Sequence, residues 1–324
     1  MTEEILPNLF RIKIPLPKNP LKYLNSYVIM GSKRNLIIDT GLNQKECLDA
    51  MQTGLHELNV DLKETDFFIT HLHADHFGLV SRLVTATSKT YFNRPDTEII
   101  EAWGGWEPMI HYGGRNGFPK DALSAALKSH PGYKFSSKWV PELSILGDND
   151  TITIGDYFFQ CVATPGHTRG HTCLYEPMKK ILISGDHILI DITPNIQCWS
   201  DQDDPLMNYL VSLNKVHELD VDLVLPGHRR LFRNHRERIA ELKKHHRNRT
   251  EEVLQILGKG PMNAFQVASE MTWDINYESW EQFPVSQKWF ATGEAIAHLR
   301  YLERKDMLLR KTEGDVTLFS LNQE

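Results

Sequence analysis

Hydrophobic and polar positions follow two different patterns along the first part of the chain. Stretches whose apolar residues alternate or run together, as in β-strands, cover residues 9–14, 27–38, 66–70 and 89–92. Stretches with apolar residues three and four positions apart, as in α-helices, cover residues 44–58 and 78–87. Strands that alternate with helices predict an α/β architecture in which the helices pack outside a sheet.

The strand pattern returns in the middle of the chain. Strands are expected at residues 151–154, 157–163, 180–184 and 222–225, with a helix over residues 205–219. Three of these strands lead into a glycine followed by a polar side chain, which is His167, Asp186 or His228. Glycine has no Cβ to crowd a tight turn, so each of these side chains can be aimed inward. Repeated at strand ends, the three residues form a constellation rather than isolated surface groups.

Residues 103–119 stand out because aromatic side chains are interleaved with five glycines. Two interpretations fit this composition. The segment is either a flexible loop that lines a pocket or a pair of helices that buries the aromatic rings. As a lid, it would offer His111 and Arg115 as polar contacts. Together with Trp199, the aromatic residues favour a partly apolar pocket suited to an acyl or aromatic group.

The C-terminal part of the chain is predicted to be mostly helical. Helices are expected over residues 235–257, 264–271 and 287–305, followed by a hairpin of residues 307–311 and 316–320. The inward residues of the first helix are expected to be Ile239, Leu242, His246, Val253, Ile256 and Leu257. This organisation predicts two domains, residues 1–230 and residues 231–324.

Composition and charge exclude several classes of function. The 324 residues are 41% hydrophobic and 24% charged, which is ordinary for a globular protein. Residues 231–324 carry 14 Lys plus Arg and 14 Asp plus Glu, so the net charge of −6 resides on residues 1–230. Neither part is a basic body, and we expect no nucleic-acid partner. No apolar run reaches the length of a membrane span, and the acidic N-terminus is unlike a signal peptide.

The cysteines indicate a reducing compartment. Cys47, Cys161, Cys173 and Cys198 show neither CxxC spacing nor a disulfide framework. We interpret them as reduced, buried thiols, which predicts a cytoplasmic protein. None is needed as a metal ligand, although Cys198 stays open as one because it lies near the presumed pocket.

The closest grouping of candidate functional side chains follows the strand of residues 66–70. His71, His73, Asp75 and His76 fall within six residues. Because a strand points alternate side chains to opposite faces, His71 and His73 should leave it on one side, and Asp75 and His76 should face back from the turn. Neutral imidazoles and a carboxylate gathered in one place are stable when a cation joins them. Zinc or a similar borderline metal suits these donors.

Four motifs, in this order, resemble those of the metallo-β-lactamase-fold superfamily of metal-dependent hydrolases. They are THLHADH at residues 70–76, PGH at residues 165–167, GD at residues 185–186 and PGH at residues 226–228. The resemblance covers residues 8–230 and implies an αββα sandwich, with two mixed sheets face to face, helices outside and metals at one edge. It further implies that His71, His73 and His167 bind one metal, that Asp75, His76 and His228 bind another, and that Asp186 bridges the two.

The resemblance also implies a reaction. Two divalent ions, Zn²⁺ with Mn²⁺ or Fe²⁺ as alternatives, would activate a shared water as hydroxide, and Asp75 would orient it as the catalytic residue. The hydroxide would attack the carbonyl of an ester, thioester or lactone in a small acyl substrate. Asp186 stands where the antibiotic-degrading branch has cysteine, as in the glyoxalase II-like, lactonase and nuclease branches. Two alternatives stay open: a phosphodiesterase or single-strand ribonuclease, and a mononuclear-iron oxidoreductase similar to the persulfide dioxygenases.

Ring nitrogens that face away from a metal need partners of their own. We expect Thr168, His187 and Asp39 to supply these partners for His71, His73 and His167, and His171 to be a structural histidine. The tail is similar to the winged-helix appendage of the lactamase-like protein 2 group. Its zero net charge, with Glu294, Glu303 and Asp306 on the helix that would enter DNA, argues against duplex binding. We expect it to pack on the catalytic domain, close the pocket or mediate homodimer contacts.

Overall fold

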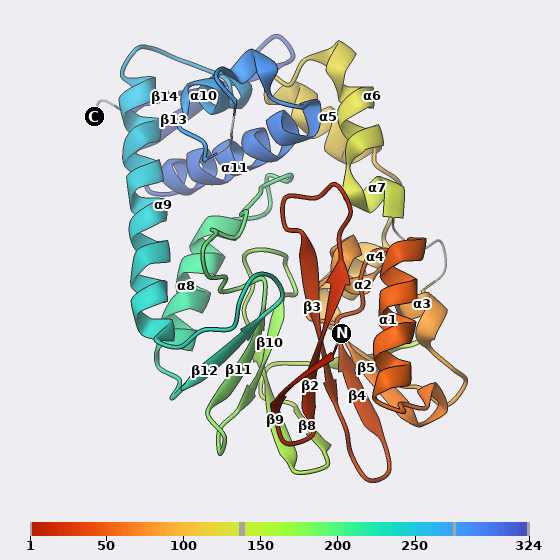
Figure 1. Cartoon of the computed structure of the whole chain (residues 1–324). Coiled ribbons are helices and arrows are strands. Elements are labelled where there is room, and N and C mark those ends of the chain that lie inside the picture. The colour runs from red at the N-terminus through yellow and green to blue at the C-terminus, as the bar shows by residue number, and fades with distance from the viewer. Residues whose placement is uncertain (1, 136–139, 275–276, 323–324) are drawn as a thin grey trace. The chain divides into compact units, whose positions relative to one another are not determined.

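The computed structural model describes residues 2–135, 140–274 and 277–322 (Figure 1). The chain folds into two compact units and passes between them several times. The first unit comprises Met1–Ala102, Lys134–Pro194 and Ser212–Ile239, and the second comprises Trp103–Tyr133, Asn195–Val211 and Ala240–Glu324. These units do not follow the boundary predicted between residues 230 and 231, because two earlier segments join the tail in the second unit. The two-domain division at that boundary stays a prediction.

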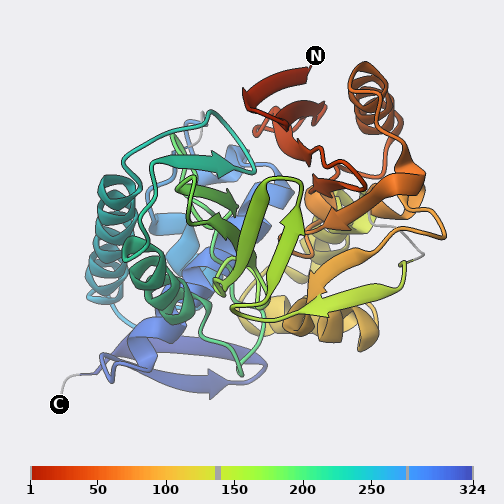
Figure 2. The same cartoon turned by 90° about the horizontal axis from the view of Figure 1, so that it is seen from below.

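The first unit contains two β-sheets, which can be followed in Figure 1 and, from below, in Figure 2. One sheet has seven strands in the order of the sequence: β1 (Thr2–Leu6), β2 (Leu9–Pro15), β3 (Tyr23–Ile29), β4 (Asn35–Ile38), β5 (Thr65–Phe68), β6 (Thr90–Asn93) and β7 (Leu143–Leu146). The other has five strands in the spatial order β12 (Leu223–Pro226), β11 (Ile181–Gly185), β10 (Thr172–Glu176), β9 (Tyr157–Ala163) and β8 (Thr151–Ile154). Each sheet mixes parallel and antiparallel pairs.

Alternation of apolar side chains explains why the sheets stack. Along β3, Tyr27 and Ile29 join the core shared with β9 to β12, whereas Val28 joins the core that contains helix α1 (Lys45–Glu57). Neighbouring strands alternate in the same way, with Phe68 on one side of β5 and Phe67 on the other. Because successive side chains point to opposite faces, both faces of the first sheet are buried. The predicted αββα sandwich is confirmed.

The remaining helices of the first unit are short. They are α2 (Ala74–Phe77), α3 (Val80–Leu83), α4 (Arg94–Glu101) and a 3₁₀ turn (Leu62–Glu64). Two sequence predictions are wrong in extent. Residues 27–38 form two antiparallel strands, β3 and β4, with a turn between them. The helix predicted over residues 78–87 is limited to one turn, because Val84 has an extended backbone with ψ 146°.

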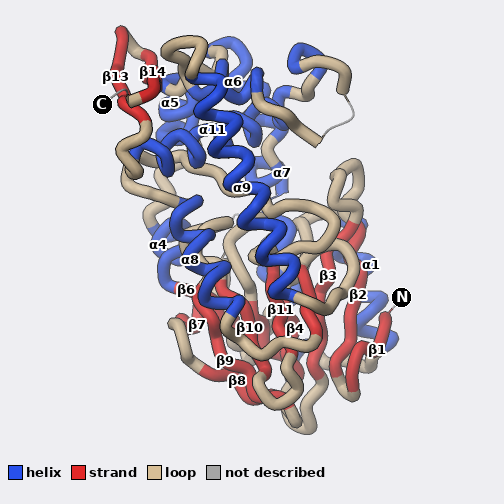
Figure 3. The backbone as a smooth tube through the Cα atoms, turned by 90° about the vertical axis from the view of Figure 1, so that its left-hand side faces the viewer, coloured by secondary structure: helices blue, strands red, loops and turns tan. Residues whose placement is uncertain are grey.

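The second unit is mostly helical and ends in a hairpin (Figure 3). Its elements are α5 (Glu107–Arg115), α6 (Lys120–Ser129), α10 (Ala264–Glu270), a 3₁₀ turn (Trp280–Gln282), α11 (Val285–Glu303), β13 (Leu308–Glu313) and β14 (Val316–Leu321). Three helices have residues in both units: α7 (Pro131–Phe135), α8 (Pro205–His217) and α9 (His235–Leu257). Residues 107–115 are helical, which favours the second interpretation of the glycine-rich segment. The six inward residues predicted for α9 are all buried.

Helix α11 is the central helix of the second unit. Every residue from Ala291 to Arg300 is buried, and the helix packs against α6, α10 and β13. Near its N-terminus, Trp289 stacks on Trp199 with ring centroids 4.1 Å apart, and Phe118 lies edge-on to the ring of Trp289. Phe118 of the glycine-rich segment therefore contributes to a packed core, whereas Trp103 is 47% exposed. Throughout the described residues, each helix is too short or too polar to span a bilayer.

Candidate metal centre

The structure brings together all seven side chains predicted to be ligands. Each follows a strand of the first unit or lies in the short helix α2 after β5, as Asp75 and His76 do. Parallel pairing of β4 with β5 and of β11 with β12 places the ends of neighbouring strands at the same edges. Ligand atoms lie within 4.8 Å of one another in three overlapping groups: His71, His73 and His167; His71, His76 and Asp186; Asp75, His76 and His228.

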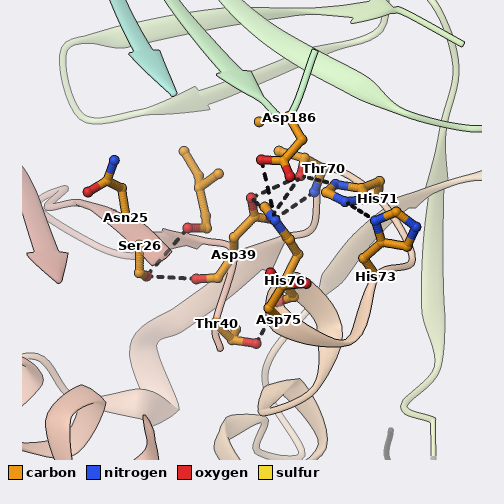
Figure 4. Close-up of polar contacts among 12 residues, drawn as sticks. Asn25, Ser26, Asp39, Thr40, Thr70, His71, His73, Asp75, His76 and Asp186 are labelled. Atoms are coloured by element: carbon orange, nitrogen blue, oxygen red, sulfur yellow. Dashed lines mark hydrogen bonds and ion pairs between the residues drawn. The ribbon is translucent and has the colours of Figure 1, made fainter. Parts of the chain in front are cut away.

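Asp39 and Thr70 orient two of the histidines (Figure 4). Thr70 Oγ1 donates to Asp39 Oδ2 at 2.9 Å, which leaves it free to accept a hydrogen bond from His71 Nδ1 at 2.9 Å. His76 Nδ1 donates to the same Asp39 oxygen at 2.7 Å. The outer nitrogen of each ring thus carries a proton, so that Nε2 of either ring presents a lone pair to the centre whenever that ring is neutral. Nε2 of His71 lies 3.1 Å from Nδ1 of His73.

His228 is held by the first sheet although it follows a strand of the second. Its Nδ1 donates to the Tyr23 carbonyl at 2.9 Å. On either side of it, the carbonyl groups of Pro226 and Arg229 accept hydrogen bonds from Asn25 Nδ2, each at 2.9 Å. Strand β3 therefore fixes both the ring orientation of His228 and the loop that carries it.

Asp186 lies between the two sets of histidines. Its Oδ1 is 3.5 Å from Nε2 of His76, and its Oδ2 is 3.6 Å from Nε2 of His167 and 3.5 Å from Nε2 of His228. The backbone N–H of Asp186 donates to Nε2 of His171 at 3.1 Å. His171 thus positions the backbone of Asp186 in addition to being the buried structural histidine expected from the sequence.

The donor atoms fit a bound cation. Donors that share a tetrahedral zinc ion at bond lengths of about 2.0–2.1 Å lie about 3.3–3.4 Å apart. The separations around Asp186 are close to that value. Within the described residues, no hydrogen bond reaches the buried Nε2 of His76, the buried Nε2 of His228 or Oδ1 of Asp186. Buried polar atoms without a hydrogen bond are unfavourable, and imidazole and carboxylate donors suit Zn²⁺, Mn²⁺ or Fe²⁺.

The electrostatics differ between the two sides of the centre. Burial, followed by repulsion from neighbouring imidazoles, lowers the pKa of His71 well below its ordinary value and lowers the pKa of His73 to about 3. Both rings are therefore neutral, which is the form that binds a metal. Burial also opposes a charge on His228, but the carboxylates of Asp186 and Asp75 outweigh it and raise the pKa of His228 to about 10.

The carboxylates remain ionised among these rings. Burial alone would raise the pKa of Asp75 and of Asp186, but His228 and His76 lower both values well below their ordinary range. Burial similarly works against a proton on His76, yet Asp39 and Asp186 raise the pKa of His76 well above its ordinary value. A cation binding on this side must displace protons from histidine.

Glycine is required at two of the strand ends, as its position in the sequence predicts. A Cβ on Gly227 would lie 2.6 Å from Oδ1 of Asp186 and 2.8 Å from Cε1 of His76. Gly185 has φ +47°, and a Cβ there would lie 2.6 Å from Nε2 of His171. A side chain at position 227 would displace candidate ligands, and one at position 185 would displace His171, which holds the backbone of Asp186.

The partners of the outer ring nitrogens differ from those expected. Asp39 contacts His76 instead of His71, His73 or His167. Thr70 is the partner of His71. The hydroxyl of Thr168 donates to Asp96 at 2.9 Å. Thr70 could have been found from its place beside His71, whereas Asp96 had no signal in the sequence. Among the described residues, Cys198 belongs to none of the three ligand groups.

Residues 21–228 match the sequence profile of the metallo-beta-lactamase superfamily, which is more than half of the chain. The chain belongs to this superfamily. Its placement there confirms the predicted enzyme class, a metal-dependent hydrolase. The profile ends at His228, the last of the seven candidate ligands.

Similar proteins agree with this placement. The chain is 28% identical over 305 residues to a probable metallo-hydrolase, YqjP, of Bacillus subtilis, which covers 90% of the chain and 92% of that protein. It is 27% identical over 225 residues to the human acyl-coenzyme A thioesterase MBLAC2, covering 64% of the chain and 74% of the relative. The crystal structure of a beta-lactamase domain protein from Burkholderia ambifaria has a TM-score of 0.86 at 25% identity, covering 99% of this chain and 94% of that one.

Proposed function

We propose that the chain is a dinuclear metal-dependent hydrolase. His71, His73 and His167 would hold one divalent ion, here named the first metal position. Asp75, His76 and His228 would hold another, the second metal position, with Asp186 shared between them. The observation that carries this proposal is the place of Asp186, whose two carboxylate oxygens lie 3.5–3.6 Å from imidazole nitrogens of both positions. Zn²⁺ is favoured because most of the donors are imidazoles.

Bound ions of this kind supply Lewis acidity and make a hydroxide nucleophile available near neutral pH. The chain contributes the rest. Asp39 and Thr70 fix the ring orientation of His76 and His71 through hydrogen bonds of 2.7 and 2.9 Å. Asp75, whose pKa is lowered by His228 and His76 against the effect of burial, is ionised and can accept a hydrogen bond from the nucleophile. No serine or cysteine nucleophile is required.

We infer that the substrate is a small acyl thioester. The human relative at 27% identity is named an acyl-coenzyme A thioesterase. Asp186 occupies the position at which the antibiotic-degrading branch has cysteine, which disfavours a β-lactam. A thioester carbonyl is also a good electrophile for an activated hydroxide. The phosphodiesterase, ribonuclease and iron-oxidoreductase alternatives have no specific support among the contacts described above.

A substrate panel tests this proposal. Zinc- and manganese-loaded protein would be assayed with acyl-coenzyme A thioesters of increasing chain length, with lactones, with bis-p-nitrophenyl phosphate and with a short RNA. We expect release of free thiol from the thioesters, and we expect it to disappear in His73→Ala and Asp186→Ala variants. Turnover of the phosphodiester or RNA alone, or thioester cleavage that survives both substitutions, would contradict the proposal.

A further inference from the structure

Two separate loops carry the three ligands of the first metal position. His71 and His73 lie after β5, whereas His167 lies after β9, in the other sheet. A metal position built from two loops depends on how far apart they are held. One direct link between them is the hydrogen bond from the N–H of Thr172 to the Thr70 carbonyl at 2.9 Å. A second link passes through the side chain of Asp96.

Asp96 is completely buried and contacts both loops at once. Its Oδ2 accepts the N–H of Leu72 at 3.0 Å and the hydroxyl of Thr168 at 2.9 Å. Its Oδ1 accepts the N–H of Gly170 at 2.8 Å. Leu72 lies between the two histidines of the first loop, and Thr168 directly follows His167. One carboxylate therefore connects Leu72, the residue between two of the ligands, with Thr168, the residue next to the third.

The position of Asp96 is itself fixed. It lies in the first turn of α4, where its backbone N–H donates to Oδ1 of the N-cap residue Asn93 at 2.7 Å. The preceding strand, β6, pairs with β5, so Asp96 is anchored on a neighbour of the strand that leads to His71. The opposing loop is shaped to approach it. A Cβ on Gly170 would lie 1.6 Å from Oδ1 of Asn93 and 2.8 Å from the backbone N of Asp96.

We propose that Asp96 is the positioning residue of the first metal position, which sets the separation of the loops that carry His71, His73 and His167. Asp96 itself touches no substrate and no metal. The proposal rests on the dinuclear centre proposed above and extends it to a residue outside the ligand set. Partners that orient metal ligands in this way typically contribute about 10–100-fold to metal affinity.

An asparagine at position 96 removes this function while keeping the shape of the side chain. Its carboxamide has a single acceptor oxygen, so its NH₂ group must face the N–H of Gly170 or the two donors at Oδ2. Thr168 offers a milder pair of variants, since Thr168→Val loses the hydroxyl and Thr168→Ser keeps it. Asp66 is a matched control. It is also buried, on β5, and accepts three hydrogen bonds, from Arg34 Nη2, Arg34 Nε and the N–H of Lys89.

The test is a titration of chelator-stripped protein with Co²⁺, followed by visible absorption. The first position is identified as the equivalent that His167→Ala removes. We expect Asp96→Asn to weaken that equivalent by about 10–100-fold and to change its ligand-field spectrum, while the other equivalent changes by less than about threefold. Thr168→Val should act in the same direction, Thr168→Ser should restore the affinity, and Asp66→Asn should leave both equivalents unchanged.

Other outcomes overturn the proposal. Equal weakening of both equivalents, or the same weakening in Asp66→Asn, would show that Asp96 acts only on general stability. If Asp96→Asn does not fold, the comparison of Thr168→Val with Thr168→Ser decides. If the unsubstituted protein binds no Co²⁺, the proposed dinuclear centre fails, whereas normal binding in the Asp96 and Thr168 variants would refute the role of Asp96 alone.

Discussion

Asp39→Asn tests whether the site depends on the residues that orient its ligands. Asp39 has φ +59°, in the left-handed region. Asparagine adopts this region readily, so the substitution keeps the backbone and the side-chain shape. It removes the negative charge and one of the two acceptor oxygens. Three hydrogen bonds are affected: those from the N–H of Thr70 at 2.8 Å, from Thr70 Oγ1 at 2.9 Å and from His76 Nδ1 at 2.7 Å.

The expected loss of unfolding free energy follows from the burial of the Asp39–His76 pair. Removing one partner of a buried charged pair destabilises a protein by about 3–5 kcal/mol. Asp186 still faces His76 after the substitution, so we expect about 3 kcal/mol in metal-free protein near pH 6, the low end of that range. The pKa of His76 is raised in the folded protein. The stabilisation is therefore fully present below the unfolded pKa of about 6.5 and is lost as the pH rises through the raised value.

Urea unfolding of metal-free protein at several pH values measures this effect. The difference between the unsubstituted protein and Asp39→Asn should shrink as the pH rises. Chelator competition should show metal affinity about 10–100-fold weaker in the variant. Asp66→Asn, which loses one of two acceptor oxygens and the negative charge beside Arg34 on β5, should be destabilised without losing metal affinity. An Asp39→Asn protein with unchanged metal affinity, or with a destabilisation independent of pH, would refute this reasoning.

Three further predictions concern protons, space and the second unit. Carboxylates hold protons on His76 and His228 in the absence of metal, so metal binding near pH 7 should release about two protons per chain and should weaken at lower pH. Calorimetry in buffers of different ionisation enthalpy measures the number of protons released. Gly227→Ala, whose Cβ would press on a ligand oxygen at 2.6 Å, should lower metal affinity at least about tenfold, whereas Gly104→Ala, with nothing within 4 Å, should not. Burial raises the pKa of Glu294 from 4.5 to about 7 against the effect of Arg249. Folding therefore takes up a proton, and unfolding free energy should fall by about 3 kcal/mol between pH 4.5 and 7 relative to Glu294→Gln, measured by denaturation at each pH.

The convergence of the candidate ligands was predictable because each is encoded locally. His71, His73, Asp75 and His76 are neighbours in the sequence, and Asp186 and His228 each follow a strand and a glycine. Short-range rules on strand direction and glycine turns suffice to aim them inward. The sandwich could be predicted for the same reason, since alternation along β3 and β5 shows which side chains face each layer.

The pairing of supporting residues with particular candidate ligands was not predictable, because these contacts act across long sequence separations. Asp39 was expected to contact a ring of the first histidine set, but the parallel pairing of β4 with β5 brings it to His76. Asp96 joins loops that lie 24 and 72 positions away from it. Nothing in the local sequence specifies which strands become neighbours, so such contacts appear only when the sheet order is known.

Two helices show the limits of reading local composition. α5 contains Gly113 and Gly114, residues that disfavour an isolated helix, yet it forms with Gly113 packed closely against Trp199 and Trp289. Tertiary packing thus overrides intrinsic preference in this segment. α11 was predicted close to its observed bounds, but its burial on all sides from Ala291 to Arg300 was not, because the partners that cover it are distant in sequence.

The metal content of the purified protein tests the central claim most directly. Elemental analysis of protein prepared without chelators should give about two equivalents of divalent metal per chain, and about one or fewer in Asp186→Ala. Thioester hydrolysis should rise and fall with that content. A single equivalent of iron in the unsubstituted protein, or full hydrolytic activity in protein shown to lack metal, would contradict the dinuclear centre.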